Sequence, residues 1–376
     1  MSHRYGQTAS GGNVGSAMQS RPFGDTGIRV SPIALGCWIF GVDWWGHREQ
    51  DDCDRLCSFA LDRGVSFFDN GDAYGNGRAE TLFGNWFKTL SADQRDGIQI
   101  GGKFGYDFYN HETVPGSHKE RPQDFSAEFM RFALEKSLDR LGVDCIDIYL
   151  AHNVKLGHYN DELFAELEKV KDEGKIKSWG VSLGPAIGWR EEGFRALGDH
   201  GAQAVQTVYN YLEQHPGREI AEMAESYNAA VMARVQDNSG VLKGVIQADT
   251  QLSQNDHRKF RDMPWRVFGP QKVEKIRPIF EKHGMTVHQF ACKWLLQSSP
   301  ALATITATLL DEAEVEEVCA AAEMPDFSNA EMQELHDLYE RDFDLPAESH
   351  ACDLKSSLAD DGKEPSRYVP PPTLVA

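Results

Sequence analysis

The stretch FFDNGDAYGNGRAE, residues 67–80, carries the pattern that decides the fold. A hydrophobic run ends on a carboxylate, Asp69, glycines and polar residues follow, and a helical pattern begins near Arg78. Tyr74 stands five residues beyond Asp69, in the polar segment. A buried strand, a short polar loop and a helix, in that order, are one unit of a repeating β/α architecture.

The same unit recurs along the chain. Apolar strands of this kind are buried on both faces, so eight units predict a single closed (β/α)8 barrel of the α/β class. Strands are expected at 32–36, 65–70, 98–104, 145–153, 176–182, 204–210, 229–235 and 301–306. Helices are expected at 51–64, 79–90, 126–142, 161–174, 189–198, 218–228, 273–284 and 312–323, with extra helices at 286–298 and 328–342.

The remaining segments predict additions to one barrel domain over residues 21–345. A turn signal at 24–27 favours an N-terminal hairpin, which in a barrel would cover the N-terminal mouth. Residues 1–20 are expected to form a disordered polar arm. Residues 346–376, rich in Pro, Ser and charge, are expected to form a tail.

Composition excludes several classes of partner. The 376 residues carry a formal net charge of −20, which argues against nucleic acid or an anionic membrane surface. The sequence has no apolar run of about 18 residues and no secretory signal pattern. Seven scattered cysteines without a CxxC pair favour neither a disulfide framework nor zinc, so a reducing, cytoplasmic location is expected.

Four titratable residues follow or end three consecutive expected strands: Asp69, Tyr74, Lys103 and His152. Each alone could be structural, as a helix cap, a solvent-exposed lysine or a buried core histidine. In a barrel, however, active sites lie at the carboxyl ends of the strands, where these side chains would meet. Their shared position therefore indicates one site.

The combination of residue types points to proton transfer. A free tyrosine titrates at about 10, and a neighbouring ammonium is expected to lower that pKa. Asp69 would keep Lys103 charged, and His152 could donate a hydrogen bond to a substrate carbonyl. Tyr74 is then a general acid for an oxygen that becomes an alkoxide, and the matching hydride must come from a nicotinamide.

The segments FFDNGDAYGNGRAE, IGGKFG, DIYLAHN, WGVSLG and VQTVYN, in this order, resemble the aldo-keto reductase superfamily. The resemblance extends from Arg21 to Phe343 and implies a barrel that interconverts carbonyls and alcohols with NADPH or NADH. It also implies a catalytic tetrad and a set of contacts to the cofactor. The tetrad falls on Asp69, Tyr74, Lys103 and His152, the nicotinamide carboxamide contacts fall on Ser182 and Gln206, and the strand-end segment touching cofactor and substrate falls on Gly36, Cys37 and Trp38.

The sequence departs from the family pattern around the cofactor. Leu183 follows Ser182 where many relatives have asparagine, and Arg234 stands where many relatives stack a tyrosine on the nicotinamide. The Gly-rich segment 237–244 is expected to wrap the pyrophosphate through Ser239, Gly240 and Leu242.

The segment after the last strand bears on the choice between NAD and NADP. Residues 306–317, TATLLDEAEVEE, contain no basic residue. A 2′-phosphate would be repelled by Asp311, Glu312 and Glu314, whereas a carboxylate can accept from a free ribose 2′-hydroxyl. NAD is therefore expected in preference to NADP, with Asp311 at the ribose.

Aromatic and polar residues in the mouth loops suggest a sugar or polyol substrate, because flat rings stack on C–H faces while hydroxyls bond polar groups. The alternative is that the rings simply pack long loops onto the barrel. Segment 106–125 is long enough to be a lid. The expected substrate contacts are Trp38, Trp44, Trp45, Tyr106 and Asn153.

Two other functions stay open at this point. One is a sugar isomerase or lyase that oxidises its substrate transiently with a retained NAD. The other is a non-catalytic, nucleotide-binding regulatory subunit. A metal-dependent hydrolase is disfavoured because His152 has no second histidine at ligand spacing, so no metal site is expected.

Overall fold

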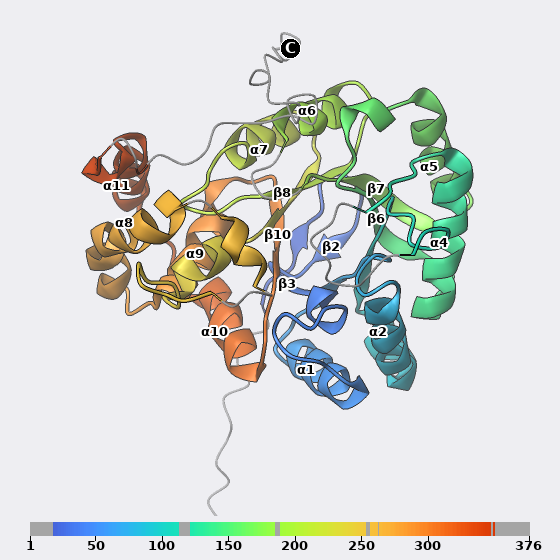
Figure 1. Ribbon diagram of the computed structural model, residues 1–376, viewed down its shortest axis with the longest axis horizontal. Coiled ribbons are helices and arrows are strands. Elements are labelled where there is room, and N and C mark those ends of the chain that lie inside the picture. Colours follow the sequence, from blue (N-terminus) through green and yellow to red (C-terminus); the bar gives the residue numbers. More distant parts are fainter. Residues whose placement is uncertain are drawn as a thin grey trace, which may run out of the picture.

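Eight parallel strands close into a barrel, in the order β10-β3-β4-β5-β6-β7-β8-β9, and helices surround them (Figure 1). The structure is a computed structural model that describes residues 18–112, 121–184, 189–252, 256–261, 263–346 and 349. The expected fold class is confirmed. The barrel strands are β3 (Ile33–Gly36), β4 (Phe67–Asp69), β5 (Gln99–Phe104), β6 (Ile146–His152), β7 (Ile176–Ser182), β8 (Ala204–Val208), β9 (Ala230–Arg234) and β10 (Leu302–Ala307).

The helices follow the expected alternation closely. The α-helices are α1 (Gln50–Asp62), α2 (Arg78–Thr89), α3 (Ala92–Asp96), α4 (Ala127–Leu141), α5 (Asp161–Asp172), α6 (Arg190–Gly198), α7 (Gly217–Ser226), α8 (Met263–Lys282), α9 (Val287–Ser298), α10 (Glu312–Glu323) and α11 (Asn329–Glu340). Short 3₁₀ helices are η1 (Cys37–Phe40), η2 (Leu156–His158), η3 (Asn238–Lys243), η4 (His257–Phe260) and η5 (Asp342–Asp344).

Two helices differ from the expectation. Helix α8 begins at Met263 rather than near residue 273, and it continues through Pro270 and Pro278. A proline ring removes one helical hydrogen bond but keeps a helical φ, so the helix can continue through Pro270. The short helix α3 was not predicted, although Ser91 and Gln94 form a capping box at its start.

A two-stranded hairpin closes the N-terminal end of the barrel, as expected. Strands β1 (Arg21–Pro22) and β2 (Arg29–Val30) pair antiparallel, and β2 is visible through the ring in Figure 1. Asp25 N donates to the carbonyl of Asn228, just before β9, at 3.0 Å. The buried side chains of this floor are Phe23, Val30, Ala34, Phe67, Ile148, Leu150, Ala204, Ala230, Met232 and Ala303.

At the C-terminal end of the barrel, the strand register places polar residues of neighbouring strands opposite one another. His152 pairs with Ser182, and Ser182 with Gln206. Asp69 pairs with Gly101, where an added Cβ would lie 3.2 Å from Asp69 Oδ1. Glycine at that position leaves room for the carboxylate to turn into the barrel.

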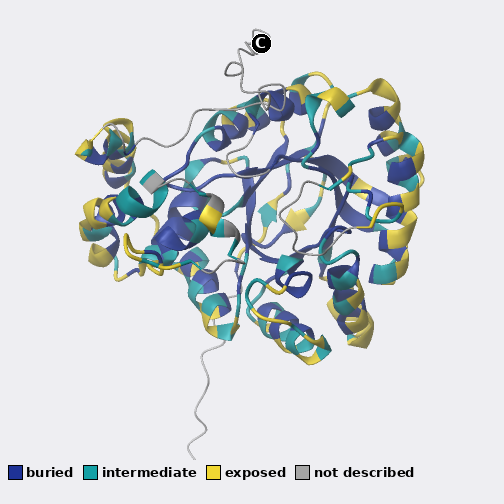
Figure 2. Ribbon diagram, viewed as in Figure 1, coloured by how far each residue is buried: buried dark blue, intermediate teal, exposed yellow. Residues whose placement is uncertain are grey.

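Burial separates the layers of the barrel as a parallel sheet requires. Figure 2 shows the strands buried and the outward faces of the helices exposed. Within the described ranges, no helix has the length and apolar character needed to cross a membrane. Segments 1–17, 113–120 and nearly all of 347–376, which include most of the expected arm, part of the expected lid and most of the expected tail, lie outside the described residues.

Candidate active site

The structure brings the four candidate catalytic side chains together at the carboxyl end of the strands. Lys103 Nζ donates to Asp69 Oδ1 at 2.6 Å and to the carbonyl of Asn70 at 2.7 Å. The same nitrogen lies 4.9 Å from the centre of the Tyr74 ring. The Tyr74 and His152 rings meet edge to face, with centroids 5.7 Å apart. A buried ion pair therefore stands beside a phenol and an imidazole.

Tyr74 is fixed by its loop as well as by its neighbours. A Cβ on Gly41 would lie 2.4 Å from the carbonyl carbon of Tyr74, so only glycine allows the two backbones to approach this closely. Arg78 Nη1 donates to the Phe40 carbonyl at 2.6 Å, and Arg121 Nη1 donates to the Ala73 carbonyl at 2.8 Å. These contacts hold the loop from both sides and aim the phenol into the mouth.

The second oxygen of Asp69 belongs to a network that reaches the last strand. Gln206 Nε2 donates to Asp69 Oδ2 at 3.0 Å, and Ser182 Oγ donates to Gln206 Oε1 at 2.8 Å. Gln206 also contacts Thr306 Oγ1 at 3.4 Å, a residue that sequence reasoning missed. Both carboxylate oxygens are thus bonded, which holds Asp69 in the orientation that Lys103 needs.

Burial decides the protonation states in this cluster. Burial opposes the charge of Lys103, yet Asp69 and Tyr74 hold the pKa of Lys103 above its usual value. Burial also raises the pKa of Tyr74, and the nearby ammonium offsets only part of that rise. The expectation of a lowered tyrosine pKa was wrong, because desolvation outweighs the lysine. Tyr74 is a protonated phenol beside a charged lysine.

His152 is held neutral. Burial lowers the pKa of His152 well below its usual value, and the positive charges of Lys103, Arg234 and Arg121 lower it further. Its Nδ1 atom is buried and has no hydrogen-bond partner among the described residues. The ring of Tyr106 lies 5.1 Å from the His152 ring, and the Tyr106 hydroxyl accepts from Asn153 Nδ2 at 2.7 Å. Two expected substrate contacts therefore sit beside the histidine.

Three tryptophans form an aromatic wall beside Tyr74. Trp38 contacts Trp44 and Trp45 edge to face, with ring centroids 4.8 and 5.4 Å apart. The Trp38 and Tyr74 ring centroids are 6.4 Å apart. The Tyr74 ring therefore lies next to this aromatic wall.

A cavity of about 300 Å³ runs from Tyr74 to the start of α10. Several residues expected to bind cofactor or substrate line it: Gly36, Trp38, Trp45, Gln206, Arg234, Ser239 and Gly240. The sequence did not single out other lining residues, among them Lys243, Arg258, Thr306 and Thr308. Lys243 lies within the segment 237–244 that was expected to wrap a pyrophosphate but was not singled out there, and no cofactor contact was expected from the segment that holds Arg258.

Other expected contacts lie outside the cavity lining. Cys37 and Leu242 are fully buried, in the hydrophobic core beneath it. Arg234, which does line it, donates a hydrogen bond to the carbonyl of Leu183. Asp311 caps α10, accepting from Glu314 N at 3.0 Å, and it is Glu314 that lines the cavity. Asp311, the expected ribose contact, therefore does not line this cavity, whereas Glu314 does.

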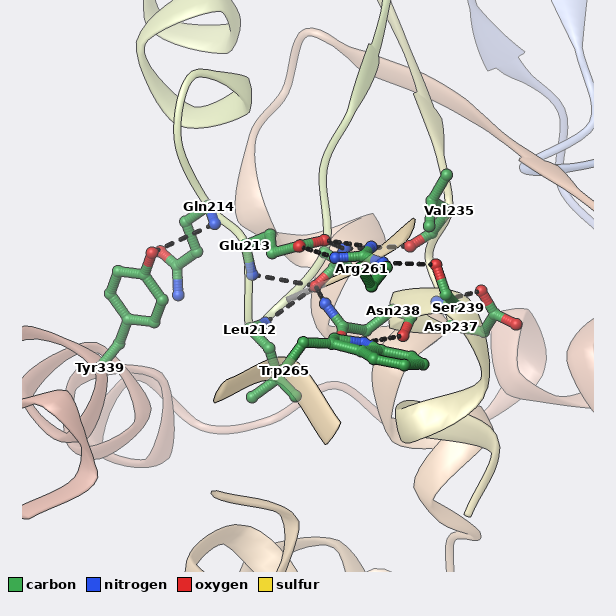
Figure 3. A network of polar contacts seen from close by, with 11 residues as sticks. Leu212, Glu213, Gln214, Val235, Asp237, Asn238, Ser239, Arg261, Trp265 and Tyr339 are labelled. Carbon is green, nitrogen blue, oxygen red and sulfur yellow. Dashed lines mark hydrogen bonds and ion pairs between the residues drawn. The ribbon is translucent and has the colours of Figure 1, made fainter. Parts of the chain in front are cut away.

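The segment η3, which forms one wall of the cavity, is anchored from behind (Figure 3). Arg261 Nη2 pairs with Glu213 at 3.0 Å, and its Nε donates to Ser239 Oγ at 3.0 Å. Trp265 Nε1 donates to the carbonyl of Asn238 at 3.0 Å. These bonds hold Ser239 and Gly240 in positive-φ conformations, with φ of 55° and 101°.

The residues around this cavity fit a nicotinamide dinucleotide. The end at Tyr74 has amide and hydroxyl groups for a carboxamide, and the wall has guanidinium and ammonium groups for a pyrophosphate. A cavity that extends from Tyr74 to the start of α10 suits a ligand whose reactive ring must reach the Tyr74 hydroxyl.

Comparison with known proteins identifies the family. A model of the Aldo/keto reductase family matches residues 32–340. The chain belongs to this family. It is an oxidoreductase family that works with nicotinamide cofactors on small carbonyl or alcohol substrates.

Similar proteins share the family across most of their length. The chain is 27% identical over 298 residues to a probable aldo-keto reductase of Glycine max, covering 77% of this chain and 81% of the relative. It is 27% identical over 285 residues to an NADP⁺ aldo-keto reductase of Schizosaccharomyces pombe, covering 74% and 80%. A glycerol dehydrogenase from Gluconobacter oxydans has the same fold, with a TM-score of 0.74 at 24% identity and coverage of 89% and 99%.

Proposed function

We propose that this aldo-keto reductase transfers hydride between a nicotinamide dinucleotide and a small carbonyl or alcohol, with Tyr74 as the general acid and base. The observation that carries the proposal is the convergence of Tyr74, Lys103, Asp69 and His152 at the mouth of the barrel. When bound, the nicotinamide supplies or accepts the hydride.

The protonation states suit carbonyl reduction. Tyr74, protonated in the free protein, gives its proton to the carbonyl oxygen as that oxygen gains charge. Lys103 stabilises the phenolate that remains, and Asp69 keeps the lysine charged and in place. Neutral His152 can donate an N–H hydrogen bond to the same oxygen. In alcohol oxidation the proton moves the other way.

We further propose a sugar or polyol as the substrate. Trp38 and Trp45 line the cavity with Tyr74, and Asn153 and Tyr106 offer polar groups beside His152. This pairing suits a molecule with C–H faces and several hydroxyls. The glycerol dehydrogenase with the same fold acts on a polyol by name, which supports this choice.

For the cofactor we propose NAD in preference to NADP, now with Glu314 rather than Asp311 as the carboxylate near the ribose. The cytoplasmic location and the absence of a nucleic-acid partner stay predictions from the sequence.

The first experiment is to analyse purified protein for bound nucleotide and then to titrate it with NADH and NADPH. Because Trp38 and Trp45 line the cavity, quenching of tryptophan fluorescence reports binding. We expect saturable binding and reduction of aldoses or small hydroxyaldehydes. Binding of neither nucleotide, with none co-purifying, would overturn the proposal. Nucleotide that survives exhaustive dialysis would favour the isomerase or lyase alternative.

A further inference from the structure

The chain segment that holds Arg121 and Gln123 connects the Tyr74 loop with the end of β6. Arg121 Nη1 donates to the carbonyl of Ala73, the residue before Tyr74, at 2.8 Å. Gln123 Nε2 donates to the carbonyl of Asn153, the residue after the end of β6, at 3.1 Å. Arg121 therefore lies at the mouth of the barrel, on the side of the segment nearest the proton donor.

Arg121 and Arg234 are two arginines of the mouth that form no ion pair among the described residues. The guanidinium of Arg121 donates to the carbonyl of Ala73, and that of Arg234 donates to the carbonyl of Leu183. A backbone carbonyl accepts a hydrogen bond but does not cancel a full charge. Arg234 lines the cavity that fits the dinucleotide, whereas Arg121 is not among the residues that line it. Arg121 is therefore the arginine that a substrate, rather than the cofactor, would meet.

The mouth carries an excess of positive charge. The charges of Lys103, Arg234 and Arg121 all lower the pKa of His152, so each of them acts at the place where a substrate carbonyl would lie. Lys103 is paired with Asp69 at 2.6 Å, which leaves the two arginines without a paired carboxylate. The chain as a whole has a formal net charge of −20, and a positive mouth in such a chain attracts anionic ligands to one place.

The carboxyl group whose charge acts on Arg121 is that of Asp72. Asp72 is fully buried, and neither of its carboxyl oxygens has a hydrogen-bond partner among the described residues. Burial raises the pKa of Asp72 well above its usual value, so this group resists taking the negative charge that would neutralise Arg121. Arg121 itself is only partly buried, and a guanidinium presents N–H groups in the planar fork that binds a carboxylate or a phosphate.

We propose that Arg121 binds a carboxylate or phosphate of the substrate while the carbonyl of that substrate lies at Tyr74 and His152. The enzyme then prefers acidic sugars or acidic hydroxyaldehydes to neutral ones. The inference rests on the proposed function, because it requires a carbonyl at Tyr74. A carboxylate and a phosphate share the property on which the contact depends, since each offers two charged oxygens that accept parallel bonds from a guanidinium.

The test compares carbonyl substrates in pairs that differ by one anionic group. D-Glucuronate is compared with D-glucose to test a carboxylate, and D-glyceraldehyde 3-phosphate with D-glyceraldehyde to test a phosphate. For the wild type we expect kcat/KM of the charged member to exceed that of the neutral member by at least about tenfold in one pair, and that pair identifies the anion. The advantage of the charged member should fall as the salt concentration rises.

Arg121→Gln should lower the ratio of charged to neutral kcat/KM by about 10- to 100-fold, because a neutral amide cannot make the charge-assisted bonds. Since Arg121 also holds the carbonyl of Ala73, turnover of both members is expected to fall, and the ratio isolates the contact with the anion. Arg121→Lys keeps the charge without the planar fork and should retain part of the preference. Arg78→Gln is the matched control, because it removes the contact with Phe40 on the other side of the Tyr74 loop. It should lower both members alike and leave the ratio unchanged.

Circular dichroism confirms that each variant is folded, and the wild-type comparison decides the question even where a variant fails to fold. A wild type without preference for the charged member of either pair would overturn this inference alone. The same holds for an unchanged ratio in Arg121→Gln, or for an equal shift of the ratio in Arg78→Gln. Failure of the wild type to reduce any carbonyl substrate with either NADH or NADPH would instead overturn the proposed function.

Discussion

The two ends of the barrel are built from the same strands but differ in the polarity of their buried side chains. At the floor, the hairpin residues Phe23 and Val30 are completely buried among apolar side chains. At the mouth, buried polar atoms such as His152 Nδ1 and Asn153 Oδ1 have no protein partner within the described part of the chain. The mouth therefore holds polar groups that a ligand could bond, while the floor holds apolar side chains that pack together.

A single strand can supply both an apolar residue to the floor and a titratable residue to the mouth. Strand β4 places Phe67 in the floor and ends on Asp69, and strand β6 places Leu150 in the floor and ends on His152. In each case a single residue separates an apolar packing position from a titratable one. Changes at one end should therefore affect stability, and changes at the other should affect chemistry.

The largest expected effect is at the mouth. Tyr74→Phe should lower kcat/KM by about 10²- to 10⁴-fold, because it removes the proton donor and little else. Steady-state kinetics with the best carbonyl substrate measures the loss, and nucleotide titration should show affinity close to that of the wild type. Tyr149→Phe is the control, since that buried hydroxyl also has no protein partner in the described structure but lies away from the mouth. Equal activities in the two variants would remove Tyr74 from the mechanism.

The counterpart at the floor is Phe23→Ala. It should lower the free energy of unfolding by about 3–5 kcal/mol, because a fully buried ring is deleted from a packed cluster. Urea unfolding followed by circular dichroism measures this. Activity per folded molecule at low temperature should stay at the wild-type level. A large loss of activity with unchanged stability would contradict the view that the floor serves packing and the mouth serves chemistry.

His152, at the mouth, should nevertheless make the folded protein less stable in acid. The pKa of His152 is lowered in the folded state, so above the unfolded pKa of about 6.5 there is no difference in protons bound. Below that pH the unfolded chain binds a proton that the folded protein refuses, and stability falls by up to about 1.4 kcal/mol per pH unit until the folded pKa is reached. Urea unfolding at stepped pH should show a shallower acid decline for His152→Gln. Parallel curves for the two proteins would mean that His152 is not the group responsible.

The smallest expected effect distinguishes two roles of Asp311, the N-cap of α10 and a contact to the cofactor. Asp311→Ala should cost about 1 kcal/mol of stability through the lost N-cap of α10. Its ratio of NADH to NADPH affinity should equal that of the wild type, in contrast to Glu314→Gln, which alters the carboxylate that lines the cavity. A changed ratio of NADH to NADPH affinity would instead indicate that Asp311 contacts the ribose.

The alternation of strands and helices, and the meeting of the tetrad, could be predicted because carboxyl ends of parallel strands always share one mouth. Asp311 and Glu314 could not be told apart in the same way. They are three residues apart at one helix start, and only the capping geometry shows which carboxylate enters the cavity. Lys243 was missed because its partner, Glu314, is on another element. The pKa of Tyr74 was misjudged because sequence shows its charged neighbours but not its burial.

Closure of the ring has a consequence for how the protein is made. The first barrel strand, β3, pairs with the last, β10, through Ile33 and Ile305, and Gln206 reaches Thr306 on that last strand. A nascent chain therefore carries Asp69 and Lys103 long before the strand that completes their setting has left the ribosome. Because such distant pairing is slow to form, we expect the mouth of the barrel to be completed late, and a chain that stops short of residue 302 lacks the strand that closes the barrel.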